Sequence, residues 1–511
     1  TRPAEESESK TAILQPPAEL TPRGVGKRLL AVPFVVAIIV LGGFFSYQYF
    51  APAKQIESIA VMPFVNESGN ADLEYLSDGM TETLISSLSQ LPNLNVKARS
   101  SVFRYKGKDT DPRNLAKELN VQAILNGRVT GRGDQLTVSL ELIDPQTEYA
   151  IWSQQYSSRQ NNLVTLQNEI ARDVSGRLRS EVSGSNGQRL TKKYSENAEA
   201  YQLYLLGRFH WKKRTKTDIH KAIDYFGQAV TKDPSYALAY SGLADAYSTL
   251  QGYDKTVSPR ESQTKAREYG LKALSLDDSL SEVHVSIGLI LQNVDFDFAG
   301  AEREFRRAID LDPKNADAYS YYALFLGGLG RFDEGETQFR HALELEPASQ
   351  NINRNYGTFL MLARRYDESE KQLRKTIELD PHFQVVYLTL ANTLMLQKRH
   401  AECVELFAKS REVAGNNAQA ASMRASFARG GWRGFILDFT GQDWIADLRP
   451  RYQDAARFAS IGENQQALDA LEDALTEREG FMAFTNVDPR FDPLRGEPRF
   501  RALLKKIGFP E

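Results

Sequence analysis

The sequence predicts a mainly α-helical protein, in which a solenoid of helical hairpins follows a small α/β domain and one transmembrane helix. Three observations lead to this fold class. Pro313, Pro347 and Pro381 stand 34 residues apart each time, a period typical of helical-hairpin repeats. Short apolar runs alternate with helical patterns over residues 55–183, and an uncharged, mostly apolar run begins at Leu29.

The composition is that of an ordinary globular protein. Of the 511 residues, 41% are hydrophobic and 25% are charged, and the formal net charge is −3. This balance gives no indication of nucleic-acid binding by this fragment. The one cysteine, Cys403, cannot close an internal disulfide, so packing must stabilise the fold. Because the first residue is Thr1 and not Met, we expect a piece of a longer polypeptide, or a processed one.

The uncharged run is predicted to form a transmembrane helix over residues 29–50. At about 1.5 Å per residue it nearly spans a hydrocarbon core of about 30 Å. Arg23, Lys27 and Arg28 precede it, so the positive-inside rule places the N-terminus in the cytoplasm and the bulk of the chain in the periplasm. Residues 1–28 show no periodicity and are expected to form a flexible cytoplasmic tether. The predicted localisation is therefore the inner (cytoplasmic) membrane, crossed once.

Two other interpretations of this run stay open. Ala51-Pro52-Ala53 resembles the cleavage site of a signal peptide, although the apolar run and the polar lead before it are long for that. A buried core helix would need apolar surroundings that the rest of the chain does not offer.

Residues 55–183 are predicted to fold as a small α/β domain. Residues 58–64 have the pattern of a buried strand, and the apolar spacing over 80–91 is helical. Residues 121–128 and 135–143 alternate apolar and polar side chains on either side of a glycine-containing turn, which predicts a β-hairpin.

The glycines of this hairpin allow other interpretations. Gly127, Gly131 and Gly133 have neither of the spacings of phosphate-binding loops, and no helix follows them. Arg132-Gly133-Asp134 is also the tripeptide of some adhesion ligands, but a hairpin turn explains it without a partner.

Five short motifs occur in order in this domain: Ile59–Phe64, Tyr75–Met80, Tyr105–Lys108, Ile124–Arg128, and Leu142–Asp144 through Trp152. With these motifs the domain resembles one that occurs in many bacterial proteins and is related to the N-terminal domain of the periplasmic protein TolB. The resemblance implies a small α/β binding or sensing module, and the family supplies no catalytic residues.

Residues 197–415 are predicted to form an array of helical hairpins. An aliphatic and acidic stretch leads into each of the three prolines, and a small residue stands ten positions after each one. In the next helix a second small residue precedes a Phe, in the pairs Ala222 with Phe226, Ala301 with Phe305, Gly335 with Phe339 and Cys403 with Phe407. Small residues let two helices approach closely, and the proline ends the second helix. These residues resemble the tetratricopeptide repeat (TPR) pattern.

The rest of the chain departs from the period. Residues 416–450 are predicted to be an irregular repeat or linker, and 451–480 a last TPR-like hairpin. Residues 481–511 are expected to form a C-terminal cap over the final apolar edge.

No catalytic or metal site is predicted. The six histidines are scattered, without a pair at metal-ligand spacing. Cys403 occupies a small-residue position, which favours packing over nucleophilic catalysis. Asp295-Phe296-Asp297-Phe298 faintly resembles a kinase motif, but the other kinase motifs are missing. We therefore expect no enzyme activity and no cofactor within this chain.

The predicted function is a membrane-anchored extracytoplasmic scaffold or sensor that binds a protein or peptide in the groove of the array. In this repeat class the first helix of each hairpin lines the concave side. The candidate binding residues on these helices are Asp245, Asn351, Arg354, Leu388, Asn392 and Met395. Solvated surface is the alternative interpretation of each polar member.

The order of domains also resembles the C-terminal sensor region of bacterial membrane proteins whose cytoplasmic part is a serine/threonine kinase. Less often that part is a winged-helix transcription regulator or an adenylate cyclase. The resemblance implies an effector domain upstream of Thr1, which is compatible with a scaffold function. A third alternative, an enzyme such as a hydrolase in the α/β domain, has no motif to support it.

Overall fold

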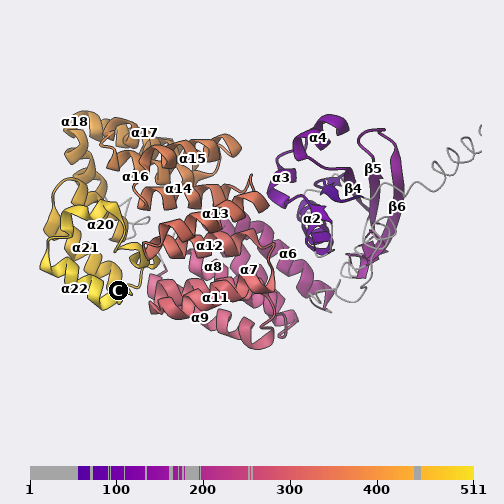
Figure 1. Ribbon diagram of the computed structural model, residues 1–511, viewed down its shortest axis with the longest axis horizontal. Helices are drawn as coiled ribbons and strands as arrows, with labels where there is room; N and C mark the ends of the chain where they lie inside the picture. Colours follow the sequence, from indigo (N-terminus) through magenta and orange to yellow (C-terminus); the bar gives the residue numbers. More distant parts are fainter. Residues whose placement is uncertain are drawn as a thin grey trace, which may run out of the picture. The chain divides into compact units, whose positions relative to one another are not determined.

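The computed structural model describes residues 56–510 (Figure 1). The exceptions are 69–72, 90, 92–93, 109, 133–134, 160–164, 168, 171, 175–177, 179–194, 196, 251–253, 255–256 and 442–450. An α/β domain comes first, and helices make up the remainder.

A mixed sheet forms the centre of the α/β domain. Its strand order is β3-β1-β4-β5-β6, and β2 also pairs with β4. The two strands that flank β1 run parallel to it, whereas β4, β5 and β6 form an antiparallel meander. The predicted hairpin is confirmed, since β4 pairs with β5 from Ile124 to Arg132. The strands are β1 (Ser58–Val61), β2 (Val65–Asn66), β3 (Asn95–Val96), β4 (Ala123–Arg132), β5 (Gln135–Ile143) and β6 (Ala150–Arg159).

The helices beside the sheet that are described from end to end are α2 (Glu74–Ser89), α3 (Arg99–Phe103) and α4 (Pro112–Leu119). Proline at the first position of α4 costs no hydrogen bond, and the Asp111 carboxylate caps this helix by accepting from Asn114 N at 2.9 Å. Met80, Leu84 and Leu88 on α2 share one buried core with the strands.

Packing explains Gly127, one of the glycines that resembled a phosphate loop. It lies inside β4, where a Cβ atom would come within 2.2 Å of the Phe64 ring. The glycine therefore lets Phe64 lie flat against the strand.

Twelve helices, among the described residues, form six consecutive hairpins. Each first helix packs against its second helix, and the first helices of successive hairpins also lie next to one another. The first helices are α6 (Ala198–Lys213), α8 (Ala237–Leu250), α10 (Ser281–Ile290), α12 (Ala316–Gly328), α14 (Gln350–Leu362) and α16 (Gln384–Leu396). The second helices are α7 (Lys216–Lys232), α9 (Pro259–Leu276), α11 (Phe298–Leu311), α13 (Phe332–Leu345), α15 (Tyr366–Leu379) and α17 (His400–Val413).

The small residues of the repeat stand where helices approach most closely. A Cβ atom on Gly335 would come within 2.6 Å of the Phe359 ring and 2.9 Å of the Ala323 carbonyl oxygen. Cys403, at the equivalent place in α17, is fully buried, and its thiol donates to the Ala391 carbonyl at 3.2 Å. Burial raises the pKa of this thiol, which makes it a poor nucleophile.

Ion pairs with the same 34-residue period link neighbouring second helices. Arg365, just before α15, pairs with Glu336 on α13 at 2.5 Å and with Glu368 on its own helix at 2.6 Å. The same geometry recurs for Arg331 with Glu302 and Glu334, and for Arg399 with Glu370 and Glu402. The charged positions therefore repeat as strictly as the apolar ones.

The first of the C-terminal helices packs on α17, and the others pack against hairpins far back in the sequence. The C-terminal helices are α18 (Asn417–Gly441, kinked at Gly431), α20 (Arg451–Ser460), α21 (Asn464–Thr476), η4 (Gly480–Phe484), η5 (Pro489–Leu494) and α22 (Pro498–Ile507). One buried core joins the last five of these to α11 and α12. Phe509 stacks on Phe298 with ring centroids 5.2 Å apart, and Phe484 lies against Gly328. The cap thus covers the third hairpin, and not only the final edge.

The predicted fold class needs one correction, which concerns its transmembrane helix. In the part of the chain that the structure describes, no helix combines the length and the apolar character that crossing a membrane requires. The physical reason is that hairpin helices bury one side and carry charges on the other. The segments 1–28 and 29–50, and the cleavage-site alternative, lie outside the described residues. The predicted single-pass inner-membrane localisation, with its cytoplasmic N-terminus and membrane contact, depended on this helix and is not supported.

Candidate functional site

The six first helices, α6 to α16, lie next to one another in a row that follows the order of the sequence. We call the side of these helices that carries their polar residues the inner row. Its members include Asp245, Glu282, Asp317, Asn351, Arg354 and Asn392. The second residue of the first helix is polar in three successive hairpins: Glu282 on α10, Asp317 on α12 and Asn351 on α14.

Five of the six predicted binding residues are partly buried on these helices, and one is in the core. Asp245 accepts a hydrogen bond from Ser286 Oγ at 2.5 Å, which joins α8 to α10. Arg354 donates to its neighbour Asn355. Asn351, Leu388 and Asn392 are partly accessible on α14 and α16. Met395 is only 5% exposed and packs with the core of the last hairpins.

The structure brings two of these residues, Asp245 and Arg354, into a charge cluster that the sequence did not reveal. Arg208 on α6 interacts electrostatically with Asp245 on α8 and Glu282 on α10. Tyr321 on α12 interacts with Asp245 and with Arg354 on α14, and burial raises its pKa to about 12. The inner charge cluster consists of Arg208, Lys212, Asp245, Glu282, Asp317 and Arg354.

Burial changes the ionisation of this cluster. It raises the pKa of Asp245 to about 6, although the Ser286 hydrogen bond and the positive charge of Arg208 act in the opposite direction. It lowers the pKa of Lys212 to about 8, again against the effect of a nearby carboxylate. Side chains that are held in an unfavourable charge state are frequent at functional sites.

Register explains why the sequence analysis missed Arg208 and Lys212. No proline precedes α6, so the period that is counted from the prolines gave no register for this helix. Glu282 and Asp317 could have been found from the position that they share with Asn351.

The pKa of Asp245 leads to a prediction about stability. Its folded value lies above its ordinary value of 3.8, so the folded state binds more protons and loses stability as the pH rises towards about 6. Asp245→Asn keeps an oxygen that can accept from Ser286 and removes the charge. We expect the variant to be more stable than the wild type above about pH 7, by on the order of 1–3 kcal/mol.

Urea unfolding of both proteins at about pH 5 and about pH 8 measures this difference. We expect the advantage of Asp245→Asn to grow between the two pH values. An advantage that is the same at both would mean that the Asp245 carboxyl does not titrate in this range.

The α/β domain contacts the inner row at the α6 end. Glu82 on α2 pairs with Lys212 and lies 3.4 Å from Arg99 Nε. Burial alone would raise the pKa of Glu82, but Lys212 and Arg99 outweigh it and lower the value to about 2. The hydroxyls of Thr83 and Tyr201 are 2.8 Å apart at the same contact. Glu82 therefore already supplies a negative charge at the α6 end of the inner row.

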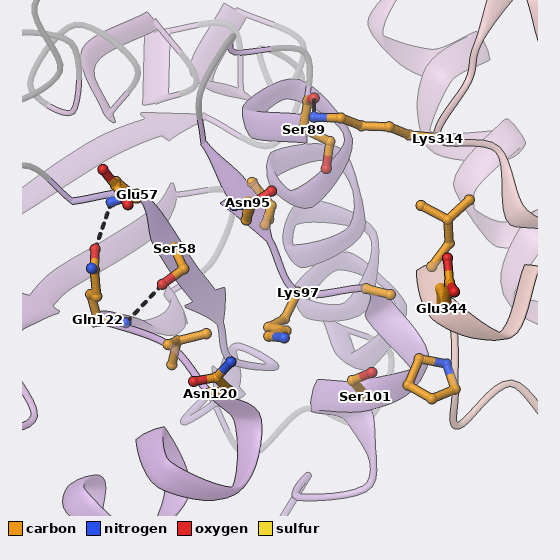
Figure 2. Close-up of a pocket in the computed structure, with 15 residues that line it drawn as sticks. Glu57, Ser58, Ser89, Asn95, Lys97, Ser101, Asn120, Gln122, Lys314 and Glu344 are labelled. Atoms are coloured by element: carbon orange, nitrogen blue, oxygen red, sulfur yellow. Dashed lines mark hydrogen bonds between the residues drawn. The ribbon is translucent and has the colours of Figure 1, made fainter. Parts of the chain in front are cut away.

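A polar cleft of about 550 Å³ lies between the α/β domain and the array (Figure 2). In Figure 2, Lys314 reaches across it and donates to the Ser89 carbonyl at the end of α2. The strand side of the cleft consists of the amino ends of β1 and β3, with Ser58 and Asn95. Because α/β sheets bind ligands at the carboxyl ends of their strands, we regard the cleft as a seam between two packed units.

Among the residues that the structure describes, no three His, Cys, Asp or Glu side chains are grouped so that they could hold a metal ion. What the inner row offers is hydrogen bonding and charge.

Comparisons with protein families match two parts of the chain. Residues 54–173 match the model of the second domain of HilA/YgeH-like transcriptional regulators. Residues 304–337, 323–382 and 360–427 match tetratricopeptide repeat models. The expected resemblances to TolB and to receptor kinases are not shown by these matches.

One curated relative is the putative adenylate cyclase 3 of Rhizobium meliloti (strain 1021), 29% identical over 240 residues. The match covers 47% of this chain and 40% of the relative, so the chain spans well under half of that protein.

The chain is also similar to solved structures, at low TM-scores. YrrB, a TPR protein with an unusual peptide-binding site, is 18% identical at a TM-score of 0.25, covering 39% of this chain and 97% of its own. PilF of Pseudomonas aeruginosa is 19% identical at 0.28, covering 54% and 98%. The lipoprotein GNA1162 from Neisseria meningitidis is 22% identical at 0.20, covering 23% and 96%. The family models and the hairpins together establish that this chain contains tetratricopeptide repeats.

Proposed function

We propose that the chain is a protein-binding scaffold whose inner row takes an extended segment of a partner polypeptide. The observation that supports this most directly is the row itself, in which polar side chains from successive first helices share one electrostatic environment. Helical-repeat arrays use such surfaces to bind peptides through several weak contacts.

The chemistry of the row suggests what the segment contains. The row carries both signs of charge, with Arg208 and Lys212 at the α6 end and partly accessible amides, Asn351 and Asn392, further along. Because Glu82 already pairs with Lys212 at the α6 end, a segment whose polar groups bond to amides would complement the rest of the row.

Site-specific photocrosslinking tests this assignment. A photoreactive amino acid at position 351 or 392 should capture a partner in cells, because both Asn351 and Asn392 are partly accessible on first helices. The matched control positions are Thr337 on α13 and Lys375 on α15, which are exposed on second helices. The same captured protein at both inner positions, with little at the controls, is the expected result. Equal capture from all four positions would contradict a site on the inner row.

A second candidate function is that of a regulatory region in a longer signalling protein. The similarity to a putative adenylate cyclase, of which the chain spans 40%, favours it, and so does the match to a domain of transcriptional regulators. In this case a nucleotide cyclase or a DNA-binding domain is encoded in frame before Thr1. Sequencing the gene upstream is the test, and a start codon immediately before Thr1 would refute this candidate.

A further inference from the structure

Helix α2 of the α/β domain has two contact sides. The side with Met80, Leu84 and Leu88 packs in the core of the α/β domain. The other side carries four residues whose spacing places them together, because residues three or four positions apart are neighbours on a helix surface. These four residues are Tyr75, Gly79, Glu82 and Thr83. We call this second side of the helix the outer side of α2.

The apolar half of the outer side lies against α6. Tyr75 packs against the buried core that contains Tyr201 and Leu205 of α6. A Cβ atom on Gly79 would come within 2.9 Å of the Leu205 side chain. The glycine therefore lets the two helices approach closely at this point.

The polar half of the outer side completes the contact with α6. Glu82 pairs with Lys212, and the hydroxyls of Thr83 and Tyr201 are 2.8 Å apart. Lys212 belongs to the inner charge cluster, so α2 places its carboxylate where the α6 end of the inner row carries positive charge. A helix that lays one side against a groove, with anchors at this spacing, is a common mode of recognition between proteins.

Two further contacts hold α2 and α3 beside the array. Lys314, in the turn before α12, donates to the Ser89 carbonyl at the end of α2 (Figure 2). Arg99 on α3 attracts the carboxylate of Glu346, which lies in the turn between α13 and α14. Both of these contacts are polar, and they come from hairpins that follow the one containing α6.

The nature of this interface allows it to open. The core of the α/β domain and the core around α6 are separate clusters, and Tyr75 packs against both of them. A polar cleft of about 550 Å³, lined by Lys314 and Asn95 among others, adjoins the contact. Domains that meet through small and polar interfaces of this kind commonly move relative to each other.

We propose that α2 is an intramolecular occupant of the α6 end of the inner row, and that a partner reaches this end with an acidic helix that takes the place of α2. The inference deepens the proposed function and rests on it, since it concerns the same surface. The competing helix needs a small residue three positions before a carboxylate, as Gly79 stands before Glu82. The rest of the row remains the place for the extended part of the segment.

A labelled peptide of residues 74–89, which is the sequence of α2, serves as the competing helix. Alanine replaces the side chains that face the core of the α/β domain, which keeps the outer side and favours helix formation. The replaced residues are Leu76, Met80, Leu84, Ile85 and Leu88. Fluorescence anisotropy then measures the affinity of this peptide for the full chain and its variants.

The variant Glu82→Lys should open the α6 end, because it sets a positive charge against Lys212. We expect this variant to bind the peptide about tenfold more tightly than the wild type, since the occupied state no longer lowers the apparent affinity. The control, Glu118→Lys, reverses a charge on α4 that pairs with Arg104, and it should bind the peptide as the wild type does. A peptide that itself carries Glu82→Lys should bind none of the three proteins.

A disulfide between α2 and α6 provides the opposite change. A Cβ atom on Gly79 would lie 3.4 Å from Leu205 Cγ, so cysteines at the two positions are close enough to bond. The pair Gly79→Cys/Leu205→Cys is placed in a chain that also carries Cys403→Ala, with and without Glu82→Lys. Oxidised glutathione should close the disulfide and abolish peptide binding to the Glu82→Lys form, and reduction should restore the binding.

The outcomes separate this inference from the proposed function. Equal affinity of the peptide for the wild type and both charge variants would overturn the inference, as would cysteines at positions 79 and 205 that do not bond. Peptide binding as expected, without capture of any partner by photocrosslinking at positions 351 and 392, would refute the proposed function and support the contact of α2 with the row.

Discussion

Replacing Asp488 with alanine should lower the free energy of unfolding by about 3–5 kcal/mol. Asp488 is 1% exposed, and its carboxylate accepts from Arg490 Nη2 at 2.6 Å and from Tyr452 OH at 2.8 Å. It also caps η5 by accepting from Arg490 N at 3.0 Å. Removing it leaves the Arg490 guanidinium in the cap with its charge uncompensated, which is the costly part.

Two further variants separate that cause from a general effect of changing the cap. The double variant Asp488→Ala/Arg490→Met removes both charges, so it should recover part of the lost stability in a double-mutant cycle. Asp492→Ala removes an exposed carboxylate from the same cap, where it pairs with Arg364, and should cost at most about 1 kcal/mol. Guanidinium unfolding followed by circular dichroism measures all of them. Equal losses for Asp488→Ala and Asp492→Ala would mean that the buried pair has no special role.

Local patterns predicted most of the secondary structure. The small residue and the Phe in each second helix, such as Gly335 with Phe339, stand in contact range of their own hairpin and its neighbour, so the period in the sequence repeats the period in space. The β4–β5 hairpin was predictable for the same reason, because its alternation and its turn are local. The periodic ion pairs around Arg365 also come from acidic and basic positions with the repeat period, but the sequence analysis did not identify them.

Long-range contacts were not predictable from such patterns. Nothing near Phe298 indicates that Phe509 will stack on it, since that contact depends on how far the array turns before the chain ends. The inner charge cluster has the same origin, because Arg208 and Arg354 stand more than four repeats apart in the sequence. The transmembrane prediction rested on composition alone, without any contact to test it.

Truncating Phe226 should be the most damaging single change in the first hairpin. Phe226 on α7 is fully buried, and its ring fills the space above two glycines of neighbouring first helices, Gly207 on α6 and Gly242 on α8. A Cβ atom at either glycine would come within 2.7 Å of the ring, so both helices are placed around it. Phe226→Ala leaves a cavity that the rigid helix backbones cannot close, with an expected loss of about 3–5 kcal/mol.

The adjacent residue provides the control for this prediction. Gly227 is in the same helix, and a Cβ atom there would have no neighbour within 4 Å. Gly227→Ala should therefore stabilise the helix by roughly 0.5–1 kcal/mol through helix propensity alone. Because α6 also carries the contact between Lys212 and Glu82, Phe226→Ala should in addition raise hydrogen exchange in α2, whereas Gly227→Ala should not. Unchanged exchange in α2 beside a large loss of stability would show that the α/β domain holds its place independently of the first hairpin.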